Sequence, residues 1–196
     1  MKSIKIVSLV LAVVMLAAVA VGCKPKLDEG VAEIAKDYYT YSVLRQDFAS
    51  INDICAYDKV KVYEQIYTNW AEEEGKSLEE YISGLAENRG IEGDVTTVDA
   101  FLKAQSERYV NNLKESGDSE KFDKTPEIID FFDANSTEIQ AVYDTLDAEY
   151  HREGVYIGDY LDYDSISDAI FVEVGVDGNN AQVLIVKIGE EWLYMA

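Results

Sequence analysis

The sequence is poor in the side chains from which most catalytic and metal sites are built. Its 196 residues include one histidine, two cysteines and two prolines. With His151 as the only histidine, zinc sites and histidine-dependent nucleophile–base sets have few ways to form. Positive charge is scarce too, since 17 Lys and Arg oppose 38 Asp and Glu to give a formal net charge of −21. This balance provides no basic face for phosphate groups and argues against nucleic acid as a partner.

The one long apolar run lies at the N-terminus, where residues 6–21 follow a basic start with Lys2 and Lys5. The run of 16 residues is shorter than the ~20 residues that span a bilayer as a helix. A charged start followed by such a run is typical of a secretory signal peptide. We therefore predict that residues 1–22 are a cleaved signal peptide. The alternative is an uncleaved membrane anchor.

Small residues close this run in front of a cysteine, in the order Ala20-Val21-Gly22-Cys23. The segment resembles the bacterial lipobox, with Ala20 at the position where Leu is usual. The resemblance implies that Cys23 receives a diacylglyceryl group, carries fatty acid such as palmitate and becomes the new N-terminus. Two or three acyl chains hold a protein durably on a membrane. We expect a lipidated tether over residues 23–30 and a location on the extracytoplasmic face of the cell membrane, with a Gram-positive surface and a periplasm both left open.

Processing at Cys23 leaves Cys55 as the only free thiol. A lone cysteine in an exported protein is either reactive or able to pair between molecules. Cys55, however, continues a stripe of apolar residues at helical spacing, where a buried cysteine acts as a small hydrophobe. We therefore predict that it is buried.

The first half of the body has the periodicity of helices. Apolar residues recur every three or four positions over residues 31–55, which predicts one helix there. A second stripe runs over residues 60–70, and Ser77 with Glu80 forms a capping box for a third helix. Thr97 is placed to cap a fourth helix that ends before Gly117.

The middle of the chain is less regular. Residues 116–124 are polar and predict an exposed connection. Thr125 and Pro126 then favour the start of a helix, because proline suits its first turn. Residues 137–154 fit a helix, but residues 137–143 also fit a strand before a shorter helix.

The last thirty residues change in character. Two runs rich in β-branched residues are separated by Asp177-Gly178, and Gly189-Glu190 precedes a third. Such dipeptides between apolar runs indicate hairpins. We predict an antiparallel meander over residues 166–196 and, with it, a single α+β domain over residues 31–196, in which N-terminal helices pack on a C-terminal antiparallel β-meander. The expected core positions include Val172, Val183, Ile185 and Trp192.

The tethered cysteine, the tyrosine-rich helical half and the ending Val-Lys-Ile-Gly-Glu-Glu-Trp-Leu-Tyr resemble small bacterial lipoproteins with a cystatin-like or NTF2-like domain. The likeness covers residues 31–196 loosely and is most specific over about the last thirty. It implies a helix lying across a curved antiparallel sheet. Because this fold hosts enzymes as well as non-catalytic pockets, the resemblance implies no reaction.

Few residue patterns indicate catalysis or metal binding. His151 lies in a charged stretch, where a histidine near a helix C-terminus favours the helix dipole. A calcium loop beginning at Asp162 places acids at positions 1, 3, 7 and 12, but Ser167 stands where the turn-forming glycine belongs. A loop beginning at Asp133 has Glu138 in that place. We therefore predict no metal site of this type and no cofactor, leaving an irregular calcium site open.

Tyrosine is the remaining anomaly, with 14 Tyr against 6 Phe. Tyrosine rings and carboxylates crowd together just before the meander, an arrangement that suits stacking on a sugar or contact with a cation. The alternative is that the rings wall the seam between helices and sheet. The candidate ligand-binding residues are Tyr156, Tyr160, Tyr163, Asp159, Asp162 and Asp164.

These observations predict a non-catalytic, membrane-anchored module that binds an extracellular ligand or partner protein, with no catalytic residues assigned. The alternative is a carboxylate-dependent hydrolase acting on cell-wall polymers. Because 38 carboxylates guarantee chance pairs, their spacing does not indicate which two would form an acid–base pair. A solute receptor of a transporter is disfavoured, since two lobes rarely fit in a chain of this length.

Overall fold

A computed structural model describes residues 26–196 of the chain, without the side chains of Asp118, Ser119 and Lys121. The predicted signal peptide and Cys23 lie outside these residues. The helices are α1 (Glu29–Tyr38), α2 (Phe48–Asp53), α3 (Lys59–Glu73), α4 (Leu78–Asn88), α5 (Val98–Glu115) and α6 (Ser136–His151), with a π-helical segment η1 (Tyr39–Arg45) and short 3-10 helices η2 (Asp118–Asp123), η3 (Ile157–Asp159) and η4 (Tyr163–Ser165). The strands are β1 (Glu127–Asp133), β2 (Ile166–Val176), β3 (Asn179–Ile188) and β4 (Glu191–Tyr194).

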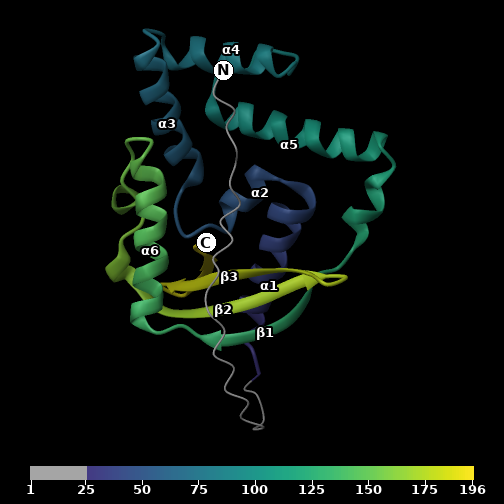
Figure 1. The fold of residues 1–196 in the computed structure, drawn as a ribbon, viewed down its shortest axis with the longest axis vertical. Coiled ribbons are helices and arrows are strands. Elements are labelled where there is room, and N and C mark those ends of the chain that lie inside the picture. Colours follow the sequence, from purple (N-terminus) through teal and green to yellow (C-terminus); the bar gives the residue numbers. More distant parts are fainter. Residues whose placement is uncertain (1–25) are drawn as a thin grey trace.

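The described part of the chain forms an α+β fold around an antiparallel sheet in the order β1-β2-β3-β4. Figure 1 shows the sheet at the bottom of the view, with α6 rising beside it and α4 and α5 at the top. The predicted meander is confirmed, since β2 pairs with β3 and β3 with β4. Its first turn has positive φ at Asp177 (51°) and Gly178 (80°), as the tight two-residue hairpin turns require.

The sheet is covered on both faces. Successive side chains of a strand point to opposite faces, so Val172 and Ile170 face one way and Ala169 and Phe171 the other. The α1 helix lies on the Val172 face, where Tyr38 packs against Tyr194 with ring centroids 5.0 Å apart. On the opposite face, residues at the start of α6 border Ala169. β-Branched side chains suit these half-enclosed pleated surfaces, and Val172, Val183 and Ile185 are fully buried as predicted. The fourth predicted core position, Trp192, is only half-buried and packs against this core.

A short segment extends the β4 edge of the sheet. Cys55 forms a parallel bridge with Tyr194, in which the Ala56 N–H donates to the Tyr194 carbonyl at 2.8 Å and the Tyr194 N–H donates to the Ile54 carbonyl at 2.9 Å. This pairing buries Cys55, as predicted, and burial raises the pKa of its thiol.

The helix predicted over residues 31–55 is wrong as one element. It is divided into α1, η1 and α2, because Gln46 takes a left-handed conformation with φ of 48°. The Asp47 side chain then accepts a hydrogen bond from the Ser50 N–H at 3.1 Å and caps α2. Apolar spacing carries through this break, so periodicity alone does not detect it.

The predicted helix start at Thr125 and Pro126 is also wrong. Residues from Glu127 onward form β1 and pair with β2, because the apolar run that follows the proline satisfies its backbone in the sheet. Proline is tolerated at a strand entry, where its missing N–H is not needed. By contrast, the ambiguous stretch after Asn135 is helical: Asn135 and Glu138 form a capping box at the start of α6.

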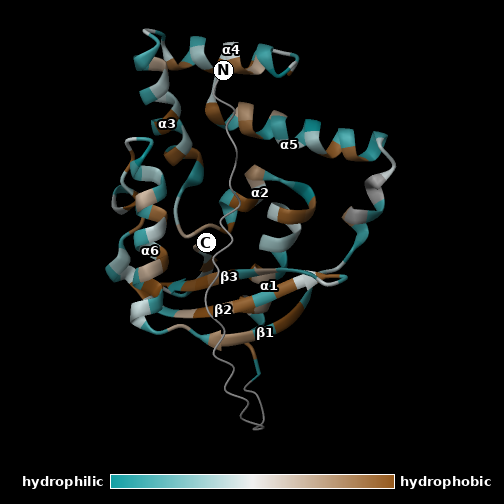
Figure 2. Ribbon diagram, in the orientation of Figure 1, coloured by the Kyte–Doolittle hydropathy of each residue, from teal (hydrophilic) through white to brown (hydrophobic). Residues whose placement is uncertain are grey.

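Three helices form a separate layer away from the sheet. The α3, α4 and α5 helices enclose a small apolar cluster, which consists of Tyr67, Ile82, Ala86, Val98, Phe101 and Leu102. The capping box of Ser77 and Glu80 and the Thr97 cap begin α4 and α5 as predicted. Figure 2 shows apolar stripes on the mostly polar α4 and α5, whereas the strands carry longer apolar stretches.

Candidate functional site

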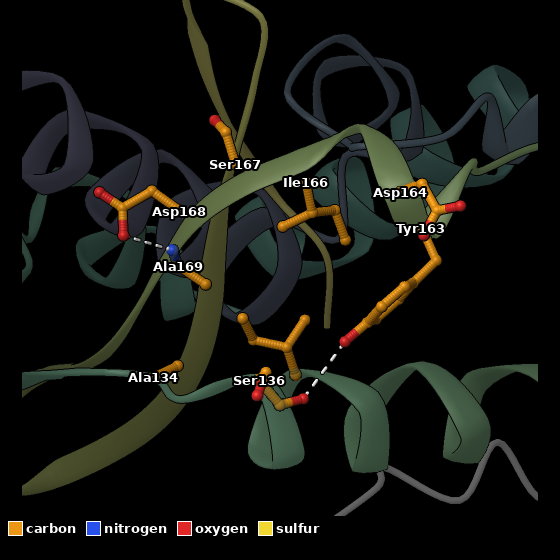
Figure 3. Close-up of a pocket in the computed structure, with 9 residues that line it drawn as sticks. Ala134, Ser136, Tyr163, Asp164, Ile166, Ser167, Asp168 and Ala169 are labelled. Carbon is orange, nitrogen blue, oxygen red and sulfur yellow. Dashed lines mark hydrogen bonds between the residues drawn. The ribbon is translucent and has the colours of Figure 1, made fainter.

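The six candidate ligand-binding residues all lie between the end of α6 and the start of β2. Two of them, Tyr163 and Asp164, border an open hollow of about 400 Å³. The hollow lies where β1 leads into α6 and where β2 begins (Figure 3). Its other lining residues come from residues 134–139 and from residues 166–169, which follow Tyr163 and Asp164: Ala134, Ser136, Ile139, Ile166, Ser167, Asp168 and Ala169.

The Tyr163 ring is fixed on one side of the hollow. Its hydroxyl donates to the Ser136 carbonyl at 3.2 Å, the bond drawn in Figure 3. Its ring meets that of Tyr143 edge-to-face with centroids 5.3 Å apart, and Tyr143 in turn donates to the Leu161 carbonyl at 3.1 Å. The hollow thus has one rigid aromatic wall.

Asp162 has a local structural role. Its side chain accepts from the Asp164 N–H at 3.1 Å, and its carbonyl accepts from the Ser165 hydroxyl at 2.6 Å. These bonds cap η4 and hold Tyr163 and Asp164 at the rim. Asp162 therefore shapes the hollow without lining it.

A bulge at the start of β2 provides the opposite rim. The register shifts between Ile166 and Asp168, which leaves Ser167 as the extra residue, and its hydroxyl donates to the Lys187 carbonyl at 3.1 Å. The Asp168 carboxylate accepts from the Ala169 N–H at 2.9 Å. Bulges commonly redirect a side chain next to a site, and here one exposes Ser167 and Asp168 at the rim.

The remaining candidates do not line the hollow. Tyr156 is 54% exposed and meets His151 edge-to-face at 4.6 Å, at the C-terminal end of α6 where the sequence placed that histidine. Tyr160 is half-buried against the core, and burial together with Asp159 raises the pKa of its phenol. The structure brings together one tyrosine and one aspartate of the six.

A second polar cluster was not anticipated from the sequence. The Lys59 ammonium donates to the Tyr194 hydroxyl at 2.8 Å, and the hydroxyls of Tyr57 and Tyr150 lie 3.1 Å apart beside it. Burial raises the pKa of the Tyr57 and Tyr194 phenols well above the usual range. Burial acts to lower the pKa of Lys59, but Tyr194 and Tyr57 act in the opposite direction and raise it.

The Lys59 cluster stabilises the fold around the β4 edge. Tyr57 is buried, as are its neighbours Cys55 and Tyr194, and no member of this cluster lines the hollow beside Tyr163. Little in the sequence indicates this cluster, because Lys59 is the first residue of α3 and a lysine at that position is typical of a solvent-exposed helix end.

Residues 26–196 contain neither a cluster of metal ligands nor a membrane-spanning helix. No group of three or more His, Cys, Asp or Glu in this range is arranged to hold a metal ion. The calcium loop beginning at Asp162 does not exist as a loop, since Asp168 and Glu173 lie in β2. In the same range, none of the helices combines the length and the apolar character needed to cross a membrane.

Comparisons with known proteins give no relative. No protein-family model, curated protein or solved structure matches this chain. The α+β arrangement therefore stands on the structure itself, and the cystatin-like or NTF2-like likeness stays a prediction from the sequence.

Proposed function

We propose that this protein is a lipid-anchored extracytoplasmic binding module that holds a ligand in the hollow beside Tyr163. The observation that carries the proposal is the construction of the hollow. A fixed tyrosine ring, two rim carboxylates and two serine hydroxyls surround an apolar floor at the edge of a rigid sheet. Concave sites with a few placed polar groups are typical of small-molecule binding.

The anchor is supported by the sequence alone. The first helix, α1, begins at Glu29, six residues after Cys23, so a lipid on Cys23 would hold the body close to the membrane. Replacement of Cys23 by alanine is expected to abolish labelling by a fatty-acid analogue and to release the protein from the membrane fraction. Unchanged mass and unchanged membrane association in this variant would contradict the anchor.

Ligand binding is tested on the full processed protein in detergent. We expect a ligand among wall fragments, oligosaccharides, peptides and amines to raise the melting temperature without being converted. A Ser136→Trp variant, which fills the hollow from an exposed position, should lose the shift, while Ser42→Trp, far from the hollow, should retain it.

The same assay addresses the hydrolase alternative. Two carboxylates, Asp164 and Asp168, lie at the rim, and glycoside hydrolysis needs a pair of them at a defined separation. Product release that disappears in Asp164→Asn or Asp168→Asn would replace the binding proposal with hydrolysis.

A further inference from the structure

The hollow lies in the most acidic stretch of the protein. Residues 127–168 contain 12 Asp and Glu but one basic residue, Arg152. The net charge of this stretch is thus −11, about half of the −21 carried by the whole chain. The stretch comprises β1, α6, η3, η4 and the first residues of β2, and its α6, η4 and β2 parts contribute most of the residues that line the hollow.

Two carboxylates of this stretch, Asp164 and Asp168, line the hollow itself. Further carboxylates lie near Tyr143, whose ring packs against the Tyr163 wall: burial and then Asp147, Asp162, Asp144 and Asp159 raise the pKa of its phenol. A concentration of like charge on one concave surface attracts counter-ions and accelerates their capture.

Basic side chains of the described residues lie elsewhere. None of the residues that line the hollow is Lys, Arg or His. Arg152 follows the C-terminal end of α6, whereas the hollow is at its N-terminal end. The backbone carbonyl of Lys187 accepts the hydrogen bond from the Ser167 hydroxyl. Its ammonium lies 5.4 Å from the Trp192 ring, on the α1 face of the sheet.

The floor of the hollow is apolar. Ile139 and Ala169 are buried, and Ile166 is half-buried between them. Figure 3 shows Ile166 in the middle of the hollow, with the Asp164 and Asp168 carboxylates on opposite sides of it. A ligand that fits this arrangement has a hydrocarbon part for the floor and positive charge for the rim.

We propose that the hollow binds the cationic end of an amine-bearing ligand. The ammonium meets Asp164 or Asp168 at the rim, and the adjoining alkyl chain covers Ile139 and Ile166 beside the Tyr163 ring. This inference rests on the proposed binding function of the hollow and names the ligand class. Anionic ligands are repelled, and neutral ligands gain the floor contact without the charge contact.

The test compares three probes of nearly equal shape, n-butylammonium, 1-butanol and butyrate. Each is titrated into the full processed protein, and binding is followed by NMR through the backbone amides of Ser136, Asp168 and Ala169. We expect n-butylammonium to bind at least ten-fold more tightly than 1-butanol and butyrate not to bind. Raising the ionic strength from about 0.01 to 0.15 M shortens the Debye length from about 30 to 8 Å and should weaken the ammonium several-fold.

Substitution of the rim carboxylates tests whether they are the groups that bind the ammonium. Asp164→Asn and Asp168→Asn together should weaken n-butylammonium binding at least five-fold, with amide spectra that otherwise match the unaltered protein. Glu79→Gln is the matched control, because it removes one exposed charge from α4 in the far layer, and it should leave the affinity unchanged.

Each outcome bears on one proposal. Equal affinity for 1-butanol and n-butylammonium, or undiminished binding in the double variant, overturns the cationic class while the hollow keeps a binding role. An equal loss in Glu79→Gln also overturns it, because it shows that net charge and not the hollow attracts the amine. Absence of shifts at these amides with every probe, together with no ligand in the melting screen, overturns the binding function as well.

Discussion

The core of the sheet layer and the core formed by α3, α4 and α5 differ in how far apart their residues lie along the chain. The sheet core joins Val31 of α1 to Met195 after β4. The six buried residues of the helical core all fall between Tyr67 and Leu102. The first core therefore depends on contacts between distant segments, whereas the second is assembled from three consecutive helices.

The two cores share one helix. Val62 and Ile66 of α3 belong to the sheet core, while Tyr67 belongs to the helical core. Tyr63 and Trp70 pack against both, and the Trp70 indole N–H donates to the Glu153 carboxylate at 3.0 Å. The α3 helix is therefore the joint of the molecule, and loss of the sheet core is expected to release α3 and with it the helical core.

The largest expected effect comes from the sheet core. Ile185 is fully buried in β3, and Ile185→Ala removes atoms that no neighbour can replace. The free energy of unfolding should fall by about 2–5 kcal/mol, measured by urea denaturation, with loss of protection of amides in both layers. Protection that persists in the sheet would show that its core is not the more widely coupled one.

The matched change in the helical core is Ile82→Ala, since Ile82 is also fully buried. We expect the free energy of unfolding to fall by less than in Ile185→Ala, by at most about 2 kcal/mol. The reason is that the three consecutive helices can open while the rest of the fold stays closed. Hydrogen exchange should accelerate in α3, α4 and α5 and remain slow in β2 and β3. Equal acceleration in both layers would contradict the division.

Alkaline pH tests the helical core through Tyr67. Burial raises the pKa of Tyr67 to about 12, and Tyr63 adds to this. The unfolded chain releases this proton near pH 10, so the stabilisation is complete below that pH and is lost as pH rises toward 12. The free energy of unfolding should therefore fall between neutral and alkaline solution, which we call the alkaline loss. Tyr67→Phe should reduce the alkaline loss by up to about 2 kcal/mol.

The control for this experiment is Tyr109→Phe, which alters a half-buried tyrosine of α5 outside both cores. It should leave the alkaline loss unchanged. If it reduces the loss as much as Tyr67→Phe does, burial in the helical core is not the cause.

The smallest effects concern helix caps, one in each layer. Ser77 begins α4 and Asn135 begins α6, both with a glutamate completing the capping box. Alanine at either position should lower stability by about 1 kcal/mol. Because Asn135 also lies beside the hollow, Asn135→Ala should in addition weaken n-butylammonium binding, whereas Ser77→Ala should not. Thermal melts measure the loss of stability, and the NMR titration measures the loss of binding.

Local signals in the sequence predicted the elements that depend on few residues. Ser77 with Glu80 and the Asp177-Gly178 turn carry their own conformational preferences, and both were predicted correctly. The start of β1 was missed because its pairing with β2 lies about 40 residues further along the chain, beyond the reach of the proline signal. The break at Gln46 was missed because a left-handed residue leaves the apolar spacing intact.

The candidate site was predictable only in part. Crowding of tyrosines and aspartates pointed to Tyr163 and Asp164, which do line the hollow. Ser136 and Ile139 carry no local sign of a site, since they join it only when α6 folds back toward β2. The Lys59 cluster was invisible for the same reason, as Tyr194 is separated from it by most of the chain.

A contact of Tyr39, the residue that directly follows α1, affects the order in which the chain can fold during synthesis. The Tyr39 hydroxyl donates to the Asn179 carbonyl at 2.6 Å across 140 residues. At about 5–20 residues per second of synthesis, that acceptor is made roughly 7–28 s after its donor. All residues of the helical core are synthesised well before Asn179, so α3, α4 and α5 can pack first. During this interval the apolar face of α1 stays exposed, because the sheet that covers it has not yet formed. Agents that shield hydrophobic surface during this interval would act on α1.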